Sequence, residues 1–312
     1  MARKLSFACV VLTLVCVAAF LQGCSELVLL NPKGPIGESE RFLILTAFVL
    51  MLLVVLPVIV MSVWFPLKYR ASNTKAAYEP EWSHSGKIEA VMWCIPLVIV
   101  LVLSVLVWRY THRLDPYKPI DPAAAQFRVD VVSLDWKWLF IYPEQGIAVV
   151  NELAFPARTP LSFQLTSDTV MTSFFIPQLG SQIYAMAGMR TRLHLLADEP
   201  GVYAGQNQQF SGAGYPTMSF AAKALSPEGF EAWAREVKKS PNTLDPARFE
   251  QLRKPSSGDP VTYFSSVSPD MFEYILNLYS PLDKVPGGGH GQGHAGQAQT
   301  GHGQPQAGHG QP

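Results

Sequence analysis

Residues that could bind a metal are almost missing from the C-terminal half of this chain. Between residues 114 and 282 there is no cysteine, and His194 is the one histidine. Copper centres that transfer electrons need thiolate and imidazole ligands, because soft donors match the soft metal. Met171 and Met218 are among the methionines that remain as soft donors, and a thioether alone is too weak to retain copper. The simpler expectation for both is core packing, since methionine fills irregular space well.

A candidate lipidation site lies near the start of the chain. Basic residues precede an apolar stretch, Phe7–Phe20, which is the layout of a signal peptide. The stretch ends in Leu21-Gln22-Gly23-Cys24, which resembles a bacterial lipobox although Gln22 replaces the usual small residue. The resemblance implies a signal peptide over residues 1–23 and a covalent lipid, such as palmitate, on Cys24. The alternative is an uncleaved anchor, which the Asn, Pro and Gly residues after Cys24 disfavour.

Two apolar stretches are long enough to cross a bilayer. Residues 42–65 and Ala90–Trp108 each have the length of about 20 residues that a transmembrane helix needs. We therefore predict spans at 42–65 and 89–110, joined by a loop at 66–88 whose basic residues favour the cytoplasm. Segment 24–41 and the C-terminal part are then periplasmic, on the outer side of a bacterial inner (cytoplasmic) membrane. The net charge is zero, which argues against a nucleic-acid partner.

After a Pro-rich linker at 111–125, residues 126–224 contain short strand-like runs separated by Pro, Gly and Asp. This pattern predicts an all-β sandwich. Alternating apolar residues predict a strand face that carries both Trp136 and Trp138, and we expect these two side chains to be core. The full alternating set is Leu134, Trp136, Trp138, Phe140 and Tyr142, and further strands are expected at Ile147–Val150, Leu161–Leu165 and Thr191–Leu195.

Residues 225–283 change to a helical pattern. Helix starts with an N-capping residue followed by proline are predicted at Ser226-Pro227, Asp245-Pro246 and Ser268-Pro269. The last helix should dock through Phe272, Ile275, Leu276 and Tyr279.

The tail at 284–312 is rich in Gly, His and Gln and is predicted to be disordered, because it has no large apolar side chain to bury. Its histidines could bind stray metal, but their spacing fixes no geometry, so we predict no specific metal site there. They are His290, His294, His302 and His309.

Taken together, lipobox, hairpin, sandwich and helical appendix resemble subunit II of haem–copper terminal oxidases over nearly all of residues 24–282. That family carries the pattern Cys-x-Glu-x-Cys-Gly-x-x-His-x-x-Met, whose glycine aligns with Gly212 here. The resemblance implies a membrane-anchored α+β chain: a transmembrane hairpin, then a cupredoxin-like Greek-key sandwich without its two-copper centre, then a short helical appendix. The positions of the lost copper ligands would be Met171, Asn207, Gln209, Ser211, Tyr215 and Met218.

The run from Ser133 to Ile147, SLDWKWLFIYPEQGI, resembles the bo-type ubiquinol oxidases in particular. The resemblance implies a non-redox structural subunit of a proton-pumping oxidase that oxidises ubiquinol and reduces oxygen to water. Haems and copper would lie in oxidase subunit I, further membrane subunits would join it, and this chain would hold no catalytic residue. The alternatives are a cytochrome c oxidase subunit II, which the missing ligands oppose, and a free copper- or peptide-binding lipoprotein, which leaves the second span unexplained.

Glu89 is a candidate for proton transfer. It lies with Ile88 and Trp93 at the predicted cytoplasmic start of the second span. The family keeps a glutamate in this setting, so the resemblance implies that Glu89 is the entry of a proton-uptake path. A carboxylate suits that role because it can take a proton from water and pass it inward. The alternative is an ordinary interfacial carboxylate favoured by the helix dipole.

Overall fold

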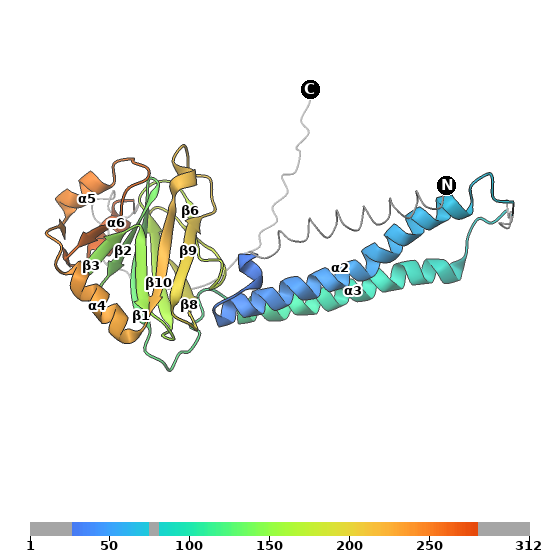
Figure 1. The fold of residues 1–312 in the computed structure, drawn as a ribbon, viewed down its shortest axis with the longest axis horizontal. Helices are drawn as coiled ribbons and strands as arrows, with labels where there is room; N and C mark the ends of the chain where they lie inside the picture. Colours follow the sequence, from blue (N-terminus) through green and yellow to red (C-terminus); the bar gives the residue numbers. More distant parts are fainter. Residues whose placement is uncertain (1–26, 75–80, 280–312) are drawn as a thin grey trace, which may run out of the picture. The chain divides into compact units, whose positions relative to one another are not determined.

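The computed structural model describes residues 27–74 and 81–279, shown as a coloured ribbon in Figure 1. The predicted signal peptide at 1–23, the lipidation site Cys24 and the His-rich tail at 284–312 lie outside the described residues. Two long helices come first in this part of the chain, followed by a β-sandwich and short helices.

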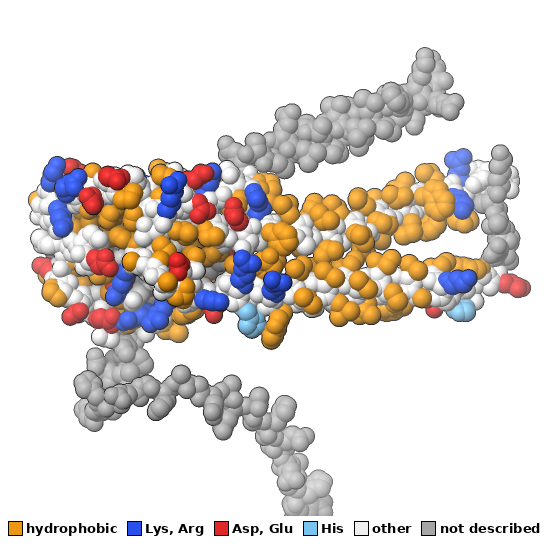
Figure 2. Space-filling view, turned by 90° about the horizontal axis from the view of Figure 1, so that it is seen from below, with side chains coloured by type: hydrophobic (Ala, Val, Ile, Leu, Met, Phe, Trp, Pro, Cys, Tyr) orange, Lys and Arg blue, Asp and Glu red, His pale blue; other side chains and the backbone are white. Residues whose placement is uncertain are grey.

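The two long helices contain the two predicted membrane spans. A short 3-10 helix, η2 (Val28–Leu30), precedes α2 (Pro35–Lys68), and α3 (Gly86–Arg113) follows the connecting loop. Both long helices are long and apolar enough to cross a membrane. Hydrophobic side chains cover them along their length, and lysine and arginine gather near their ends (Figure 2). Each helix extends beyond its apolar stretch, because polar residues continue the helix outside the bilayer.

The sandwich consists of a six-stranded and a five-stranded sheet. Spatial order is β12-β3-β2-β1-β5-β8 in the first sheet and β4-β10-β9-β6-β7 in the second. Most neighbours are antiparallel, but β1 is parallel to β5, and β4 is parallel to β10. The strands of the two sheets are β1 (Phe127–Leu134), β2 (Lys137–Tyr142), β3 (Ile147–Val150), β4 (Glu152–Pro156), β5 (Leu161–Ser167), β6 (Thr172–Phe175), β7 (Ile183–Ala185), β8 (Thr191–Leu195), β9 (Gly201–Asn207), β10 (Ser219–Leu225) and β12 (Thr262–Phe264).

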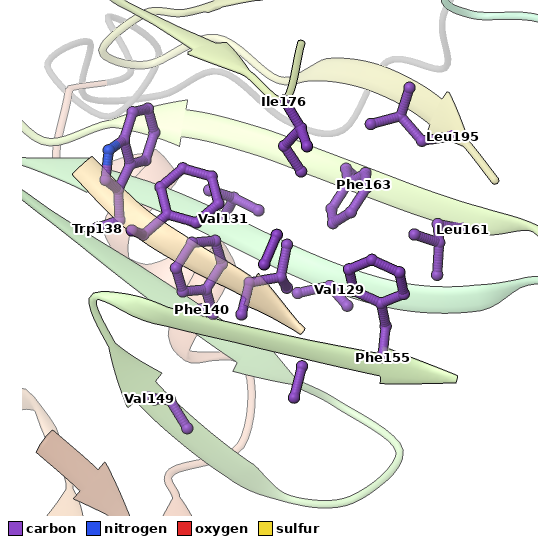
Figure 3. Close-up of a cluster of buried hydrophobic side chains, with 14 of the residues drawn as sticks. Val129, Val131, Trp138, Phe140, Val149, Phe155, Leu161, Phe163, Ile176 and Leu195 are labelled. Carbon is purple, nitrogen blue, oxygen red and sulfur yellow. The ribbon is translucent and has the colours of Figure 1, made fainter. Parts of the chain in front are cut away.

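The main core lies between the two sheets, where aromatic and branched side chains interdigitate (Figure 3). Phe140 and Phe163 are fully buried there, and Phe174 stacks on Phe220 with ring centroids 5.2 Å apart. The predicted sandwich and three of its predicted strands are confirmed. Burying this apolar surface is the dominant stabilising contribution, since the soluble part has no cysteine for a disulfide.

One strand prediction was wrong. The run from Leu134 to Tyr142 is not a single strand, because β1 ends at Leu134 and a tight turn separates it from β2. Trp136 lies in that turn with φ of 62° and is half-buried, whereas Trp138 lies on β2 and is fully buried. Leu134 belongs to a second apolar cluster on the other face of the sheet. The turn has two residues, so the alternation of apolar and polar residues continues through it unchanged. The alternation therefore does not reveal the turn.

The helical appendix covers the edge and the outer face of the first sheet. Its helices are α4 (Pro227–Val237), α5 (Pro246–Leu252) and α6 (Met271–Asn277), and a small parallel pair joins β11 (Thr243–Leu244) to β13 (Ser266–Val267). Phe249, Phe272 and Ile275 pack with residues of β1, β2 and β3 in the second apolar cluster.

The helix starts were mostly predicted correctly. Ser226 caps α4 by accepting a hydrogen bond from the Gly229 N–H, and Asp245 caps α5 through the Arg248 N–H. The third start was wrong: α6 begins at Met271 rather than after Ser268, and its N-cap Asp270 has φ of 55° and makes no capping hydrogen bond through its side chain.

Candidate functional site

Three segments meet at one end of the sandwich, and they contain the six positions that the sequence analysis compares with copper ligands. They are the turn at 135–136, the segment 168–173 and the loop 207–218 between β9 and β10. The Trp136 indole donates to the Ser211 carbonyl over 2.9 Å, and Thr169 donates to the Asp135 carboxylate over 2.7 Å. The tertiary structure therefore brings together segments that lie up to about 80 residues apart in the sequence. Such segments meet only when folding closes the long loops between them.

Asn207 is the hub of the loop. Its side-chain oxygen accepts hydrogen bonds from the backbone N–H groups of Ser173 and Gln209, each over 2.9 Å. Its side-chain nitrogen faces the Gln209 carbonyl at 2.8 Å, the Ser211 hydroxyl at 3.2 Å and the Met218 sulfur at 3.3 Å. The Asn207 residue is buried, so these polar groups satisfy one another away from water. One amide thus ties the loop to β6 and closes it on itself.

Trp136 holds the tip of the same loop. Its ring lies against Gly214, where a Cβ atom would stand 2.2 Å from the indole. Only glycine permits this close approach of the loop backbone to the ring. Gly212, with φ of 106°, adopts a backbone conformation that other residues rarely reach. Trp136 therefore packs against the loop, and the expectation that its side chain belongs to the core was wrong.

The two methionines have different environments. Met218 is 2% exposed and packs in the main core, as predicted. Met171 is 42% exposed, so the expected core packing was wrong for this residue. It lies immediately before β6, after the bend at residues 168–170. Of the six positions compared with copper ligands, Asn207, Gln209, Ser211 and Met218 make contacts with one another. Tyr215 joins them through its carbonyl, which accepts from the Met218 N–H over 3.1 Å, whereas no hydrogen bond in the described part of the chain joins Met171 to the set.

The donor set at this loop does not fit a two-copper centre. It offers a carboxamide, a hydroxyl and a thioether, and none of them bridges two soft metal ions as a thiolate does. In addition, the amide nitrogen of Asn207 stands against the Met218 sulfur, the one soft donor of the set. Residues 27–74 and 81–279 contain no group of three or more His, Cys, Asp or Glu side chains placed to hold a metal ion.

A charged cluster beside the loop was missed in the sequence. Asp168 is 1% exposed and accepts from the Arg253 guanidinium over 3.0 Å and from the Tyr279 hydroxyl over 3.2 Å. Burial raises the pKa of Asp168 despite the opposing effect of Arg253. The cluster ties the appendix to the segment that leads into β6. No local signal could have revealed it, because the partners are more than 80 residues away.

The remaining candidate residues lie elsewhere. Glu89 is in the first turn of α3 and is exposed on this chain. His194 is on β8, paired across the sheet with Ser162, and burial lowers its pKa. His194 lies on a strand of the other sheet from β9 and β10, which flank the loop, so it is not part of the candidate site.

Comparison with known proteins gives consistent matches. Residues 128–225 match the family described as the periplasmic domain of cytochrome c oxidase subunit II, and residues 238–281 match the COX aromatic rich motif. The cytochrome bo(3) ubiquinol oxidase subunit 2 of Pseudomonas aeruginosa is 55% identical over 279 residues, which are 89% of this chain and 84% of that protein. The ubiquinol oxidase subunit 2 of Acetobacter aceti is 52% identical, over 86% of this chain and 89% of that protein. Among solved structures, the periplasmic domain of subunit II of cytochrome oxidase from Bradyrhizobium japonicum aligns with a TM-score of 0.36 at 22% identity, covering 38% of this chain and 96% of that one.

Proposed function

The chain belongs to the ubiquinol oxidase subunit 2 family, and from that membership we propose that it serves a quinol-oxidising enzyme as a subunit without a redox centre. It is a membrane-anchored subunit of a haem–copper respiratory oxidase, with a cupredoxin-like domain. The enzyme would oxidise ubiquinol and reduce oxygen to water, and the resemblance drawn from the sequence is thereby confirmed at the level of the family.

The observation that carries the proposal is the Asn207 hub. A cytochrome c oxidase subunit II passes electrons through copper in this loop, whereas here a carboxamide joins Ser173, Gln209 and Ser211 by hydrogen bonds. Electrons from a soluble cytochrome would have no acceptor at this end of the sandwich. A lipid-soluble quinol needs no such acceptor, because it can deliver electrons to the complex from within the membrane.

We further propose the place of the chain in the complex. Oxidase subunit I would hold the haems and copper, and α2 and α3 would pack against it and other membrane subunits. The basic loop at 66–88 would be cytoplasmic and the sandwich periplasmic at a bacterial inner membrane, which agrees with the positive-inside rule. The sandwich would then act as a lid and assembly brace over the membrane part.

The test of this function is the choice of electron donor. The complex purified in mild detergent should consume oxygen with a ubiquinol analogue and should not accept electrons from reduced cytochrome c. Metal analysis should find the copper of the partner subunit alone, and loading with copper salts should produce no purple absorption from a two-copper centre. Turnover with cytochrome c, or stoichiometric two-copper loading of this chain, would refute the proposal.

Glu89 is proposed as the entry of a proton-uptake path. Glu89→Ala should slow quinol oxidation about tenfold, because other cytoplasmic groups still deliver protons but less directly. Glu89→Asp should be milder. Oxygen consumption measures the effect, with haem spectra to show intact assembly. Glu81→Gln is the matched control, since Glu81 is an exposed acidic residue in the adjoining loop. Normal turnover in an assembled Glu89→Ala complex would leave Glu89 an interfacial carboxylate.

Cys24 is proposed as the lipidated N-terminus of the mature chain. Cys24→Ser should abolish lipidation and slow removal of residues 1–23, and the shift in intact mass of the purified subunit measures both. Activity should change little, because two spans still anchor the subunit far more strongly than a lipid does. Wild-type protein that retains residues before Cys24 would contradict the assignment.

A further inference from the structure

A groove lies at the end of the helical hairpin that adjoins the sandwich. Its volume is about 360 Å³, and it is lined by α2, by α3 and by one residue of the sandwich, Ser181. Most of its lining is apolar, and includes Leu43, Leu103 and Leu106. Glu40 and Tyr110 contribute polar groups. The groove therefore combines an apolar region between two membrane helices with a polar region.

Glu40 is the charged residue of the groove. Its carboxylate is half-buried and accepts a hydrogen bond from the Ser181 hydroxyl. Among the residues that the structure describes, no lysine, arginine or histidine forms an ion pair with it. A carboxylate beside apolar side chains is costly to desolvate unless a cation or further donors compensate. Glu40 thus offers an acceptor for a positively charged hydrogen-bond donor.

The position of the groove along the hairpin indicates the kind of ligand. Glu40 lies two residues before the apolar stretch 42–65, and Tyr110 lies two residues after Trp108, so both stand at the level of the lipid headgroups. Leu43 and Leu106 lie about one helical turn deeper, at the edge of the hydrocarbon region. The polar part of the groove therefore lies where a lipid headgroup would be, and the apolar part lies where its acyl chain would be.

We propose that this groove binds one phospholipid with a primary ammonium headgroup, such as phosphatidylethanolamine, through Glu40. The ammonium group supplies both the positive charge and the N–H donors that the carboxylate lacks. An anionic headgroup would be repelled by Glu40, and the quaternary ammonium of phosphatidylcholine has no N–H to donate. The acyl chain would lie between α2 and α3 along Leu43, Leu103 and Leu106.

Lipid retention in the complete complex tests the proposal. Native mass spectrometry of the purified oxidase should show that Glu40→Gln loses one phosphatidylethanolamine per complex. Glu38→Gln is the matched control, because Glu38 is exposed on the same helix two residues away and does not line the groove, and it should retain the lipid. The Leu103→Trp complex should also lack the lipid, because the larger side chain fills the groove without changing its charge. This variant tests the proposal even if the Glu40→Gln complex does not assemble.

A second measurement separates the possible ligands. Phosphatidylethanolamine added back to the delipidated complex should raise its melting temperature more than phosphatidylcholine or phosphatidylglycerol does, and Glu40→Gln should remove that difference. Equal effects of the three lipids would overturn the proposal. So would unchanged lipid in Glu40→Gln, release of ubiquinol instead of phospholipid, or a basic residue of another subunit paired with Glu40 in the assembled oxidase.

Discussion

Replacing Asn207 by leucine is expected to lower the free energy of unfolding of the sandwich by about 2–4 kcal/mol, because buried polar groups lose their partners. Leucine has nearly the same size but accepts no hydrogen bond, so the N–H groups of Ser173 and Gln209 would remain unpaired. The loop 207–218 should also open, since the Ser211 and Met218 contacts are lost. Thermal unfolding of the purified complex measures the first effect, and hydrogen–deuterium exchange of the loop the second.

Gln209→Ala is the matched control for Asn207→Leu. Gln209 contacts Asn207 through its backbone N–H and carbonyl, which alanine retains. Its exchange rates and melting temperature should therefore stay close to wild type. Unchanged protection of the loop in Asn207→Leu would show that packing of Trp136 on Gly214 holds the loop without the carboxamide.

Replacing Glu152 by alanine is expected to destabilise the sandwich by about 2–3 kcal/mol, because the buried hydrogen-bond donors around it lose their acceptor. Glu152 is 4% exposed and accepts from Lys223 over 2.6 Å, from the Trp233 indole over 2.9 Å and from the Tyr263 hydroxyl over 2.9 Å. One carboxylate thus joins β4 and β10 to α4 and β12. Its loss should loosen α4, and limited proteolysis of the purified complex within residues 226–242 should detect this.

The effect of Glu152 should depend on pH. Burial alone would raise the pKa of Glu152, but the hydrogen bonds from Lys223, Trp233 and Tyr263 outweigh it and bring the pKa below the ordinary value. A carboxylate with a depressed pKa in the folded state stabilises the protein fully above its unfolded pKa and loses this contribution as the pH falls through the folded pKa. The gap in melting temperature between wild type and Glu152→Ala should therefore narrow on acidification.

Glu231→Ala is the control for Glu152→Ala. Glu231 lies on the same helix, α4, but it is 72% exposed and stands 3.8 Å from Arg235. An exposed pair of this kind contributes little to stability. Its removal should leave both melting temperature and proteolysis unchanged. Equal destabilisation by the two substitutions would mean that α4 depends on its surface charge rather than on the buried carboxylate.

Features that depend on residues close together in the chain could be predicted from the sequence. The spans within α2 and α3 follow from apolar length, and the starts of α4 and α5 follow from Ser226 and Asp245, whose side chains cap the adjacent turn. The shortage of thiolate and imidazole is likewise a property of composition. The capping and apolar-length signals involve residues close together in the chain, and the shortage of ligands is a matter of composition. Neither depends on a tertiary contact.

The candidate site is built from contacts between residues that are far apart in the sequence. Asn207 joins two segments because folding brings Ser173, 34 residues away, against its side chain. Trp136 lies in a turn rather than in a strand, and its ring packs on Gly214. The sequence likewise did not predict the exposure of Met171 or the contacts of Asp168 with Arg253 and Tyr279. A hydrogen bond between distant residues depends on which strands become neighbours, and that choice is made by burial of the whole core rather than by the residues that form the bond.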